Sequence, residues 1–293
     1  MPVEIAGVPK LMMRDTGAYA TTLSAKAADE LKLESSRSTD LEAFDVTGAK
    51  ANRSVRASLK IGNLKGDNMF FMLGTQYLDD FGDPRVAGLL GASILAGYDL
   101  SIDFGARTLT LLSPNHCEGK VVYWPERPVA MIPFKLQNRN EIILTVTLDG
   151  KEVVAQLDTG ASSSTLEKKK AARLFDIVPG SADTPVAGNL NGAEGVTTWK
   201  HRFKSLSLAG IEVANPEIKI IPDKISEKVN TWSTGSLLDA RANGNRDEAP
   251  MLLGMNVLKD LHIYIAYKEK KLYITSSGKP AVAATPAAPV KAN

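Results

Sequence analysis

The tetrapeptide Asp-Thr-Gly-Ala occurs twice in this chain of 293 residues, at positions 15–18 and at positions 158–161. Two carboxylic acids held a few ångströms apart cannot both ionise easily, so they share one proton. The ionised member of such a pair can take a proton from water, and the protonated member can donate one to a carbonyl oxygen. A fold that brings Asp15 and Asp158 together would therefore have the groups needed to hydrolyse a peptide bond without a metal.

The elements around the two tetrapeptides form an internal repeat. Strand-like residues precede each aspartate, from Val3 to Met13 and from Leu144 to Leu157, and Asp149-Gly150 predicts a hairpin turn in the second copy. A helix-like segment follows each tetrapeptide, with Ser24 and Thr165 as the predicted N-cap residues.

The repeat continues downstream. Leu89-Leu90-Gly91 in the first copy corresponds to Leu252-Leu253-Gly254 in the second, and a pair of strand-like segments follows each, 99–104 with 107–111 and 260–265 with 271–274. The interval from Asp to this Gly is 76 residues in the first copy and 96 in the second. We expect the extra residues to form a surface loop at Glu227–Pro250, which is rich in Gly, Asn and Asp.

Through these motifs the chain resembles the aspartic proteases, and in particular their retropepsin-like branch, from about Val3 to Ser276. The resemblance implies a mostly β fold with two pseudo-symmetric retropepsin-like β-barrel lobes, the acid protease fold, and a short helix in each lobe. The proline-containing stretch 114–133 predicts the boundary between the lobes, so we expect lobes at 1–120 and 121–277. The Ala/Pro-rich tail at 278–293 is expected to be disordered.

The resemblance also assigns roles to single residues. Asp15 and Asp158 would be the catalytic dyad of an endopeptidase that uses a water molecule and no cofactor. The hydroxyls of Thr16 and Thr159 would hydrogen-bond across the lobe interface. Gly17 and Gly160 would permit the tight turn through which main-chain N–H groups reach the carboxylates. The two Leu-Leu-Gly segments would pack behind these loops and hold the acids in place.

A peptide or protein substrate would lie in the cleft as an extended strand, held by a β-hairpin flap. The candidate flaps are residues 44–50 and 185–192, with Gly48 and Gly188 in their turns. Ordinary hairpin turns are the alternative interpretation of both segments.

Arg14 departs from the family pattern, which has an apolar residue before the aspartate, as Leu157 is in the second copy. A cation beside Asp15 would favour its charged form and disturb proton sharing. The alternative function is therefore a catalytically weak or inactive peptide-binding protein that keeps the fold. A third hypothesis is a domain-swapped dimer, which the short spacing between the copies argues against, so we expect a monomer whose two lobes form an intramolecular pseudo-dimer.

Other candidate residues receive structural interpretations. His116 and Cys117 are adjacent but lack the partners of a zinc site, so no metal site is predicted. His201 and His262 are expected to be ordinary polar positions in strands. The run Ser162–Ser164 is expected to cap the following helix rather than to supply a nucleophile.

Composition excludes several classes of protein. Lys and Arg total 35 against 33 for Asp and Glu, a net charge of +2, which argues against a nucleic-acid-binding protein. A single cysteine excludes an intramolecular disulfide. We expect neither a transmembrane segment nor a signal peptide in the sequence given. The resemblance favours a periplasmic or secreted protein whose leader is absent from this sequence, and a cytoplasmic protein is the alternative.

Overall fold

The computed structural model describes residues 1–37, 43–44, 50–74, 76–79, 81–124, 128–137, 140–190, 196–223 and 249–277. Strands dominate these residues and the helices are short, which confirms the predicted mostly β fold. Residues 227–248 of the predicted loop and the predicted tail at 278–293 lie outside the described ranges. The described residues contain no helix that is long and apolar enough to cross a membrane.

In the first repeat (residues 2–112), six of the described strands close into a barrel, because β1 pairs with both β2 and β7. Their order is β1-β2-β9-β3-β8-β7, and β4 extends the sheet beyond β7. The strands are β1 (Pro2–Ile5), β2 (Val8–Arg14), β3 (Thr22–Leu23), β4 (Ser35–Arg37), β7 (Arg53–Ile61), β8 (Leu64–Leu73) and β9 (Val86–Leu90). The smaller elements are α1 (Ala25–Glu30), β5 (Ala43–Phe44), β6 (Lys50–Ala51), the 3₁₀ helix η1 (Gln76–Asp79) and α2 (Ala92–Leu95).

The second repeat (residues 141–276) has the same strand order, β14-β15-β22-β16-β21-β18-β17. Its strands are β14 (Glu141–Leu148), β15 (Lys151–Leu157), β16 (Thr165–Glu167), β17 (Val186–Asn189), β18 (Thr197–Arg202), β19 (Ser205–Leu208), β20 (Ile211–Ala214), β21 (Glu217–Ile221) and β22 (Met251–Leu253). Its helices are α3 (Lys168–Phe175) and α4 (Met255–Leu258). The directions also correspond, since β2–β9 and β15–β22 are parallel whereas β3–β9 and β16–β22 are antiparallel. This shared topology confirms the internal repeat.

The two repeats differ in the continuity of their long hairpin. The first repeat has the unbroken pair β7 and β8, whereas the second has β18 and β19 followed by β20 and β21. Pro216 lies between β20 and β21, and a proline cannot donate a hydrogen bond to the sheet. Strand β19 pairs with β14 as β7 pairs with β1. Strands β18 and β19 together therefore occupy the place that the single strand β7 has in the first repeat.

One of the two predicted helix caps is wrong. Ser24 caps α1, since its hydroxyl accepts the N–H of Ala27 at 3.0 Å. Thr165 lies instead in β16, where it pairs with Lys219 and Leu252. Helix α3 begins three residues later, at Lys168. Strand pairing with two distant segments outweighs the local capping preference at Thr165, and such pairing cannot be read from local sequence.

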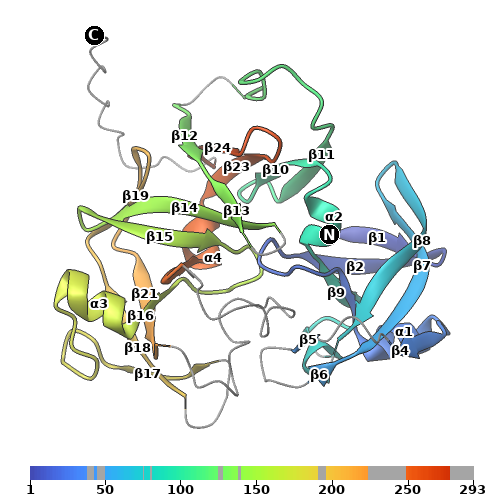
Figure 1. Cartoon of the computed structure of the whole chain (residues 1–293), viewed down its shortest axis with the longest axis horizontal. Coiled ribbons are helices and arrows are strands. Elements are labelled where there is room, and N and C mark those ends of the chain that lie inside the picture. The colour runs from blue at the N-terminus through green and yellow to red at the C-terminus, as the bar shows by residue number, and fades with distance from the viewer. Residues whose placement is uncertain are drawn as a thin grey trace.

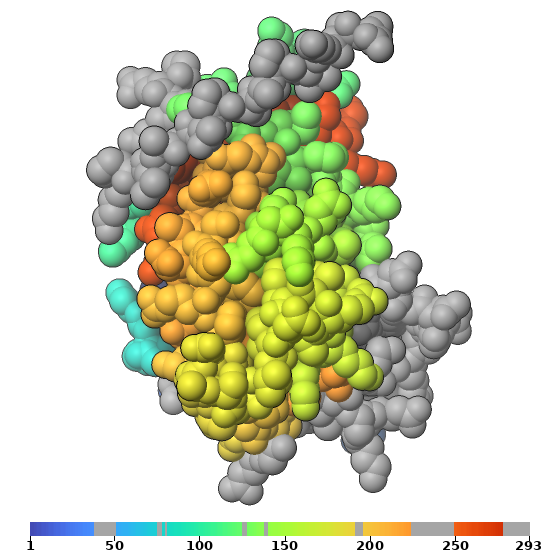
Figure 2. Space-filling view, turned by 90° about the vertical axis from the view of Figure 1, so that its left-hand side faces the viewer, coloured from blue at the N-terminus to red at the C-terminus, as the bar shows by residue number. Residues whose placement is uncertain are grey.

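The last strands of both repeats join a single five-stranded sheet, with the order β11-β10-β23-β24-β12. Its members are β10 (Asp99–Asp103), β11 (Thr108–Leu112), β12 (Ala130–Pro133), β23 (Leu261–Ala266) and β24 (Lys271–Ser276), while β13 (Lys135–Gln137) pairs with β14. In Figure 1 this sheet lies above and between the two repeats. In Figure 2 the second repeat fills the visible face, with green and red residues of the five-stranded sheet beyond its upper edge. Contact between β10 and β23 thus joins the repeats.

The hydrophobic core is continuous between the repeats. One cluster of buried side chains includes Leu90 and Leu100 of the first repeat and Leu253 and Ile263 of the second. Burial of so much apolar surface on both sides of the repeat boundary stabilises the relative position of the two halves. The loops that follow β2 and β15 are therefore held by one common core.

Candidate active site

Asp15 and Asp158 each follow directly on a strand that ends beside a Leu-Leu-Gly segment. Asp15 comes after β2, and its N–H donates to the carbonyl of Leu90 at 2.9 Å. Asp158 comes after β15, and its N–H donates to the carbonyl of Leu253 at 3.0 Å. The parallel pairs β2–β9 and β15–β22 thus fix the start of both aspartate loops from behind.

Each carboxylate accepts two main-chain hydrogen bonds from its own loop. Oδ1 of Asp15 accepts the N–H groups of Gly17 and Ala18, both at 2.9 Å. Oδ1 of Asp158 accepts those of Gly160 and Ala161, at 2.8 and 3.1 Å. Because Oδ1 is held by two donors on each side, Oδ2 is the oxygen left for other chemistry.

The two loops are tied to each other through their threonines. The N–H of Thr16 donates to Oγ1 of Thr159 at 3.2 Å, and the N–H of Thr159 donates to Oγ1 of Thr16 at 3.1 Å. Each hydroxyl then donates onward across the interface, Thr16 to the carbonyl of Leu157 at 3.1 Å and Thr159 to that of Arg14 at 3.2 Å. These four bonds relate the two loops by an approximate two-fold symmetry and leave little freedom between them.

The glycines of the two tetrapeptides lie against the opposite aspartates. A Cβ atom on Gly17 would lie 2.4 Å from Cγ of Asp158, and one on Gly160 would lie 2.3 Å from Cγ of Asp15. The main-chain N–H groups reach the carboxylates as expected, but neither glycine has a positive φ, so a left-handed backbone is not the reason for glycine here. They are needed for space, because any side chain would overlap the acid that belongs to the other repeat.

This arrangement places the two carboxyl groups beside each other, since each lies against the glycine of the loop that holds the other. Both are buried, with 5% of Asp15 and 2% of Asp158 exposed. Burial raises the pKa of Asp15, against the hydrogen bonds from Ala18, Asp158 and Gly17 that favour its charged form. Burial raises the pKa of Asp158 well above its ordinary value, and the negative charge of Asp15 adds to that effect. A buried pair of this kind is most stable with one proton between the two acids.

Comparison with known proteins identifies the family of the chain. The family model described as aspartyl protease matches residues 1–94 and 144–257, a region in each repeat that contains one Asp-Thr-Gly-Ala. The chain belongs to the aspartyl protease family. A solved structure, a retropepsin-like aspartic protease from Rickettsia conorii, is similar at 16% identity and a TM-score of 0.32, over 50% of this chain and 90% of that one. No curated protein matches the chain at a significant level.

A Leu-Leu-Gly segment supports each aspartate, as in the aspartyl protease family pattern. A pair of polar side chains, which we name the bracket, attaches this segment to the aspartate loop. In the first repeat, Thr21 Oγ1 accepts the N–H of Gly91 at 3.2 Å and the hydroxyl of Ser93 at 3.1 Å. Ser93 Oγ accepts the N–H of Thr21 at 2.9 Å. The bracket therefore closes a loop of hydrogen bonds between the aspartate loop and the start of α2.

The second repeat has the same bracket built from different residues. Ser164 Oγ accepts the N–H of Gly254 at 2.9 Å and donates to Oδ1 of Asn256 at 2.8 Å. Asn256 also accepts the N–H of Ser164 at 2.6 Å and donates to the carbonyl of Glu217 at 2.7 Å. The expectation that Ser164 caps the following helix is thus wrong. A signal was present in the sequence: Thr21 and Ser164 both lie six positions after the aspartate, and Ser93 and Asn256 both lie two positions after the glycine.

Arg14, which departs from the family pattern, packs on an aromatic side chain. Its guanidinium lies over the ring of Phe104, with Cζ 4.8 Å from the ring centroid. Burial lowers the pKa of Arg14, and its Nε is buried without a hydrogen-bond partner among the described residues. Arg14 is not among the groups that shift the pKa of Asp15. Its packing on Phe104 takes the place of the apolar contact that the family pattern has at this position.

The remaining candidates lie elsewhere in the fold. His201 bonds to the hydroxyl of Thr184 at 2.8 Å, and His262 bonds to that of Ser101 at 2.9 Å. His116 contacts Asp99 rather than a metal-ligand set, and no cluster of potential metal ligands occurs in the described part of the chain. Gly48 lies outside the described residues. Gly188 lies within strand β17 at a bulge, with φ +100°, and not in the turn that was expected there.

Proposed function

We propose that this member of the aspartyl protease family is an endopeptidase in which Asp15 and Asp158 form the catalytic dyad. The observation that supports the proposal is that two buried carboxyl groups, one from each repeat and each fixed through Oδ1, lie against the glycine of the opposite loop and so beside each other. Their Oδ2 atoms would face a shared water molecule. The proposal needs no cofactor, since the dyad itself supplies the acid and the base.

In the first step, the ionised carboxylate would take a proton from water while the water oxygen attacks the carbonyl carbon of the peptide bond. The protonated carboxyl would donate its proton to the carbonyl oxygen, which gives a neutral tetrahedral diol. In the second step, the dyad would return one proton to the amide nitrogen and accept one from a diol hydroxyl as the C–N bond breaks. The products are a carboxylic acid and an amine, and the dyad ends with one proton, as it began.

The substrate proposed for this site is an extended peptide or protein segment. Such a strand could add its main-chain hydrogen bonds to a neighbouring hairpin. The hairpin of β17 and β18, paired from Val186 and Trp199 to Asn189 and Thr197, is our candidate flap in the second repeat. Both acids come from one chain, so we propose that a monomer is active, with lobes at 1–120 and 121–277.

The proposal is tested with denatured casein between pH 3 and 8, with and without a transition-state inhibitor of aspartic proteases. We expect inhibitor-sensitive cleavage by the native chain and a loss of at least about 100-fold in Asp158→Asn, the scale of general acid–base catalysis. Ser162→Ala, an exposed residue of the same loop, is the control. Full activity in Asp158→Asn would overturn the proposal. A mass measurement in solution separates the active monomer from the domain-swapped dimer.

The alternative function, peptide binding without catalysis, was motivated by Arg14. Arg14 packs on Phe104 and is not among the groups that shift the pKa of Asp15. Arg14 therefore gives no reason to prefer the alternative. Binding of casein peptides without turnover at any pH would nevertheless select the alternative.

A further inference from the structure

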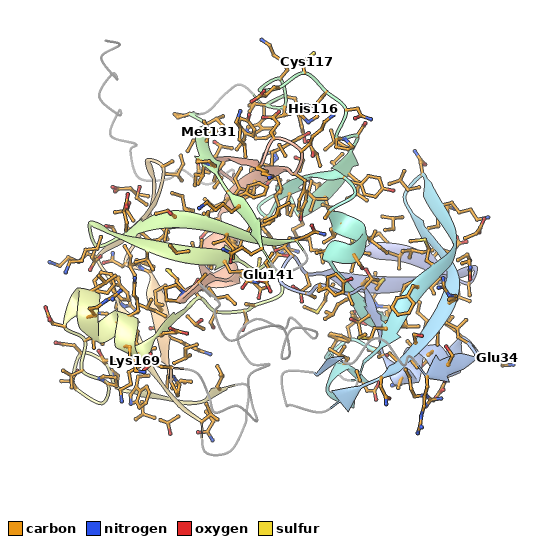
Figure 3. All side chains as sticks on the ribbon, in the orientation of Figure 1. Glu34, His116, Cys117, Met131, Glu141 and Lys169 are labelled. Carbon is orange, nitrogen blue, oxygen red and sulfur yellow. The ribbon has the colours of Figure 1, made fainter. Side chains whose placement is uncertain are left out.

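Residues 113–124, which we name the connector, follow β11 and lie against the five-stranded sheet. Val121 is buried with Tyr264 and Tyr273 of β23 and β24, and Trp124 packs against the same cluster. The ring of Trp124 stacks on His262 with centroids 3.9 Å apart. Figure 3 shows His116 and Cys117 on this side of the molecule, far from Lys169 of α3. The connector therefore covers strands that come from the second repeat.

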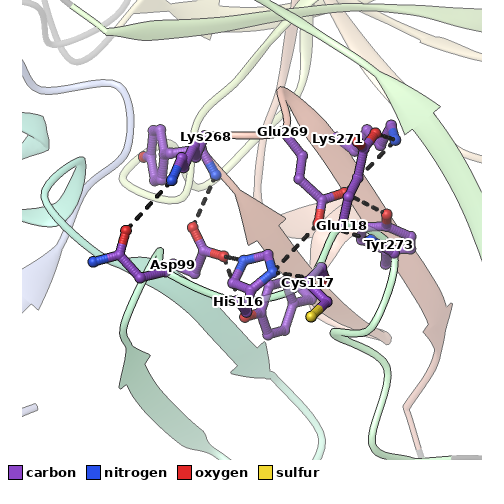
Figure 4. A network of polar contacts seen from close by, with 12 residues as sticks. Asp99, His116, Cys117, Glu118, Lys268, Glu269, Lys271 and Tyr273 are labelled. Atoms are coloured by element: carbon purple, nitrogen blue, oxygen red, sulfur yellow. Dashed lines mark hydrogen bonds and ion pairs between the residues drawn. The ribbon is translucent and has the colours of Figure 1, made fainter.

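Within the connector, His116 lies between two carboxylates that belong to different repeats (Figure 4). Its Nε2 is 2.5 Å from Oδ2 of Asp99, the first residue of β10. Its Nδ1 is 3.5 Å from Oε1 of Glu269, in the turn between β23 and β24. Exposed fractions are 0% for the Asp99 side chain, 6% for Glu269 and 18% for His116, so solvent screens these contacts only weakly.

Both carboxylates are held by further donors. Asp99 accepts the hydroxyl of Tyr264 at 3.2 Å and the N–H of Tyr267 at 3.1 Å. Glu269 accepts the N–H of Gly119 at 3.0 Å and the hydroxyl of Tyr273 at 2.7 Å. In the part of the chain that the structure describes, His116 is the only basic side chain in ion-pair contact with Asp99.

The lysines near this site contact groups other than Asp99. Lys271 of β24 is 3.7 Å from Glu269 and 2.5 Å from Glu118. Lys268 reaches Oδ1 of Asn115 at 3.4 Å. His116 also contacts the carbonyl of its neighbour Cys117 at 3.2 Å. The positive side chain next to the buried Asp99 is thus His116 and not a lysine.

The electrostatic balance favours a charged imidazole. Burial by itself lowers the pKa of His116, but the Cys117 carbonyl, Asp99 and Glu269 outweigh it and raise that pKa above its ordinary value. Burial opposes the charge on Glu269, yet Tyr273, Gly119, Lys271 and His116 together lower its pKa. A charged imidazole beside an ionised Glu269 is consistent with these two shifts.

We propose that His116 is a pH-sensitive clasp, which fastens the connector to the five-stranded sheet when it is protonated and loosens it when it is neutral. The clasp joins Asp99 of the first repeat to Glu269 of the second through a residue that lies between the repeats in sequence. Since the pKa of His116 is raised by folding, its stabilisation is complete below the unfolded value of about 6.5 and is lost as the pH rises through the folded value. The proposal is independent of whether the chain cleaves peptides.

The first test is the pKa of His116, measured by NMR titration of the histidine ring nitrogens in the native chain, with His201→Gln and His262→Gln used for assignment. We expect a value above 6.5, the ordinary value for histidine. A value at or below that overturns the proposal. This measurement needs no variant of His116 and so does not depend on the folding of one.

The second test compares thermal unfolding of the native chain and His116→Gln, which keeps a neutral donor and removes the charge. We expect the variant to lose at least about 2–4 °C at pH 5.5, the shift for each kcal/mol in a large domain, and less than half of that loss at pH 8.5. His201→Gln, which removes a ring bonded to the uncharged Thr184, is the matched control for the loss of an imidazole outside the clasp. An equal loss for His116→Gln at both pH values would refute the clasp.

A third measurement reports on the connector itself. Hydrogen exchange of residues 113–124, corrected for the intrinsic pH dependence, should show protection at pH 5.5 that falls at pH 8.5 in the native chain and is low at both in His116→Gln. If His116→Gln does not fold, Asp99→Asn with His116→Gln removes the unpaired buried charge. That pair should abolish the pH dependence of protection, and persistence of the dependence would contradict the proposal.

Discussion

Gly160 is so close to Asp15 that a single added methyl group would overlap the carboxyl of the acid, with Cβ 2.3 Å from Cγ. Gly17 has the same relationship with Asp158, at 2.4 Å. Each repeat thus supplies one acid and the gap into which the other acid fits. The two loops fit against each other, so a larger side chain at either glycine also disturbs the acid of the other loop.

Gly160→Ala should therefore impair the site more than the fold. We expect a loss of cleavage of at least about 100-fold, because the methyl group displaces Asp15 from its partner, together with a moderate decrease in Tm from overpacking. Gly97→Ala is the control, since its Cβ would meet no atom of either aspartate and would need only a small shift of the Ile94 carbonyl oxygen, 3.3 Å away. Casein cleavage and calorimetry of both variants check this, and a fully active Gly160→Ala would contradict it.

The dyad should make the folded state less stable as the pH rises. Burial raises the pKa of both aspartates above their unfolded values, so the folded chain binds more protons than the unfolded chain above about pH 4. Stability from this source is present at acidic pH and is lost as the pH rises through the folded pKa values. The Tm of Asp158→Asn relative to the native chain should therefore increase from pH 4.5 to pH 8, and a constant difference would argue against a shared proton.

The bracket in the second repeat should position Asp158 through Gly254. Ser164→Ala removes an acceptor for a buried N–H and a donor to Asn256, a change that costs about 1–3 kcal/mol. We expect a lower Tm and a lower kcat with a smaller effect on KM. Ser162→Ala, in the same loop but exposed, should match the native chain. Equal kinetics for the two variants would show that the bracket has no influence on the acids.

Arg14→Leu should be tolerated. Leucine stands at the corresponding position of the second repeat, and the substitution removes a buried Nε that has no partner in the described residues. It also removes the contact with Phe104, which is worth about 0.5–2 kcal/mol, so we expect a small net change in Tm. The pH profile of cleavage should not move, because Arg14 is not among the groups that shift the pKa of Asp15. A displaced profile would instead show that Arg14 acts on the dyad.

The sequence by itself determined the repeat, the strands and the pair of acids. Asp15 and Asp158 are recognisable because their tetrapeptides, the strands before them and the Leu-Leu-Gly segments after them recur in one order. Period-two alternation and turn residues are local signals, so the mostly β fold could be predicted from them. The cap at Ser24 was predictable for the same reason, since capping involves residues three positions apart.

Only the tertiary structure decided what each residue touches across the chain. Thr165 looks like a cap but pairs with two distant strands, and Ser164 binds Asn256 and Gly254 instead of a helix. Gly17 and Gly160 look like turn glycines but are required by acids 141 and 145 positions away along the chain. The shared core and the five-stranded sheet bring these residues together. No local sequence pattern encodes the resulting distances, so they could not be predicted.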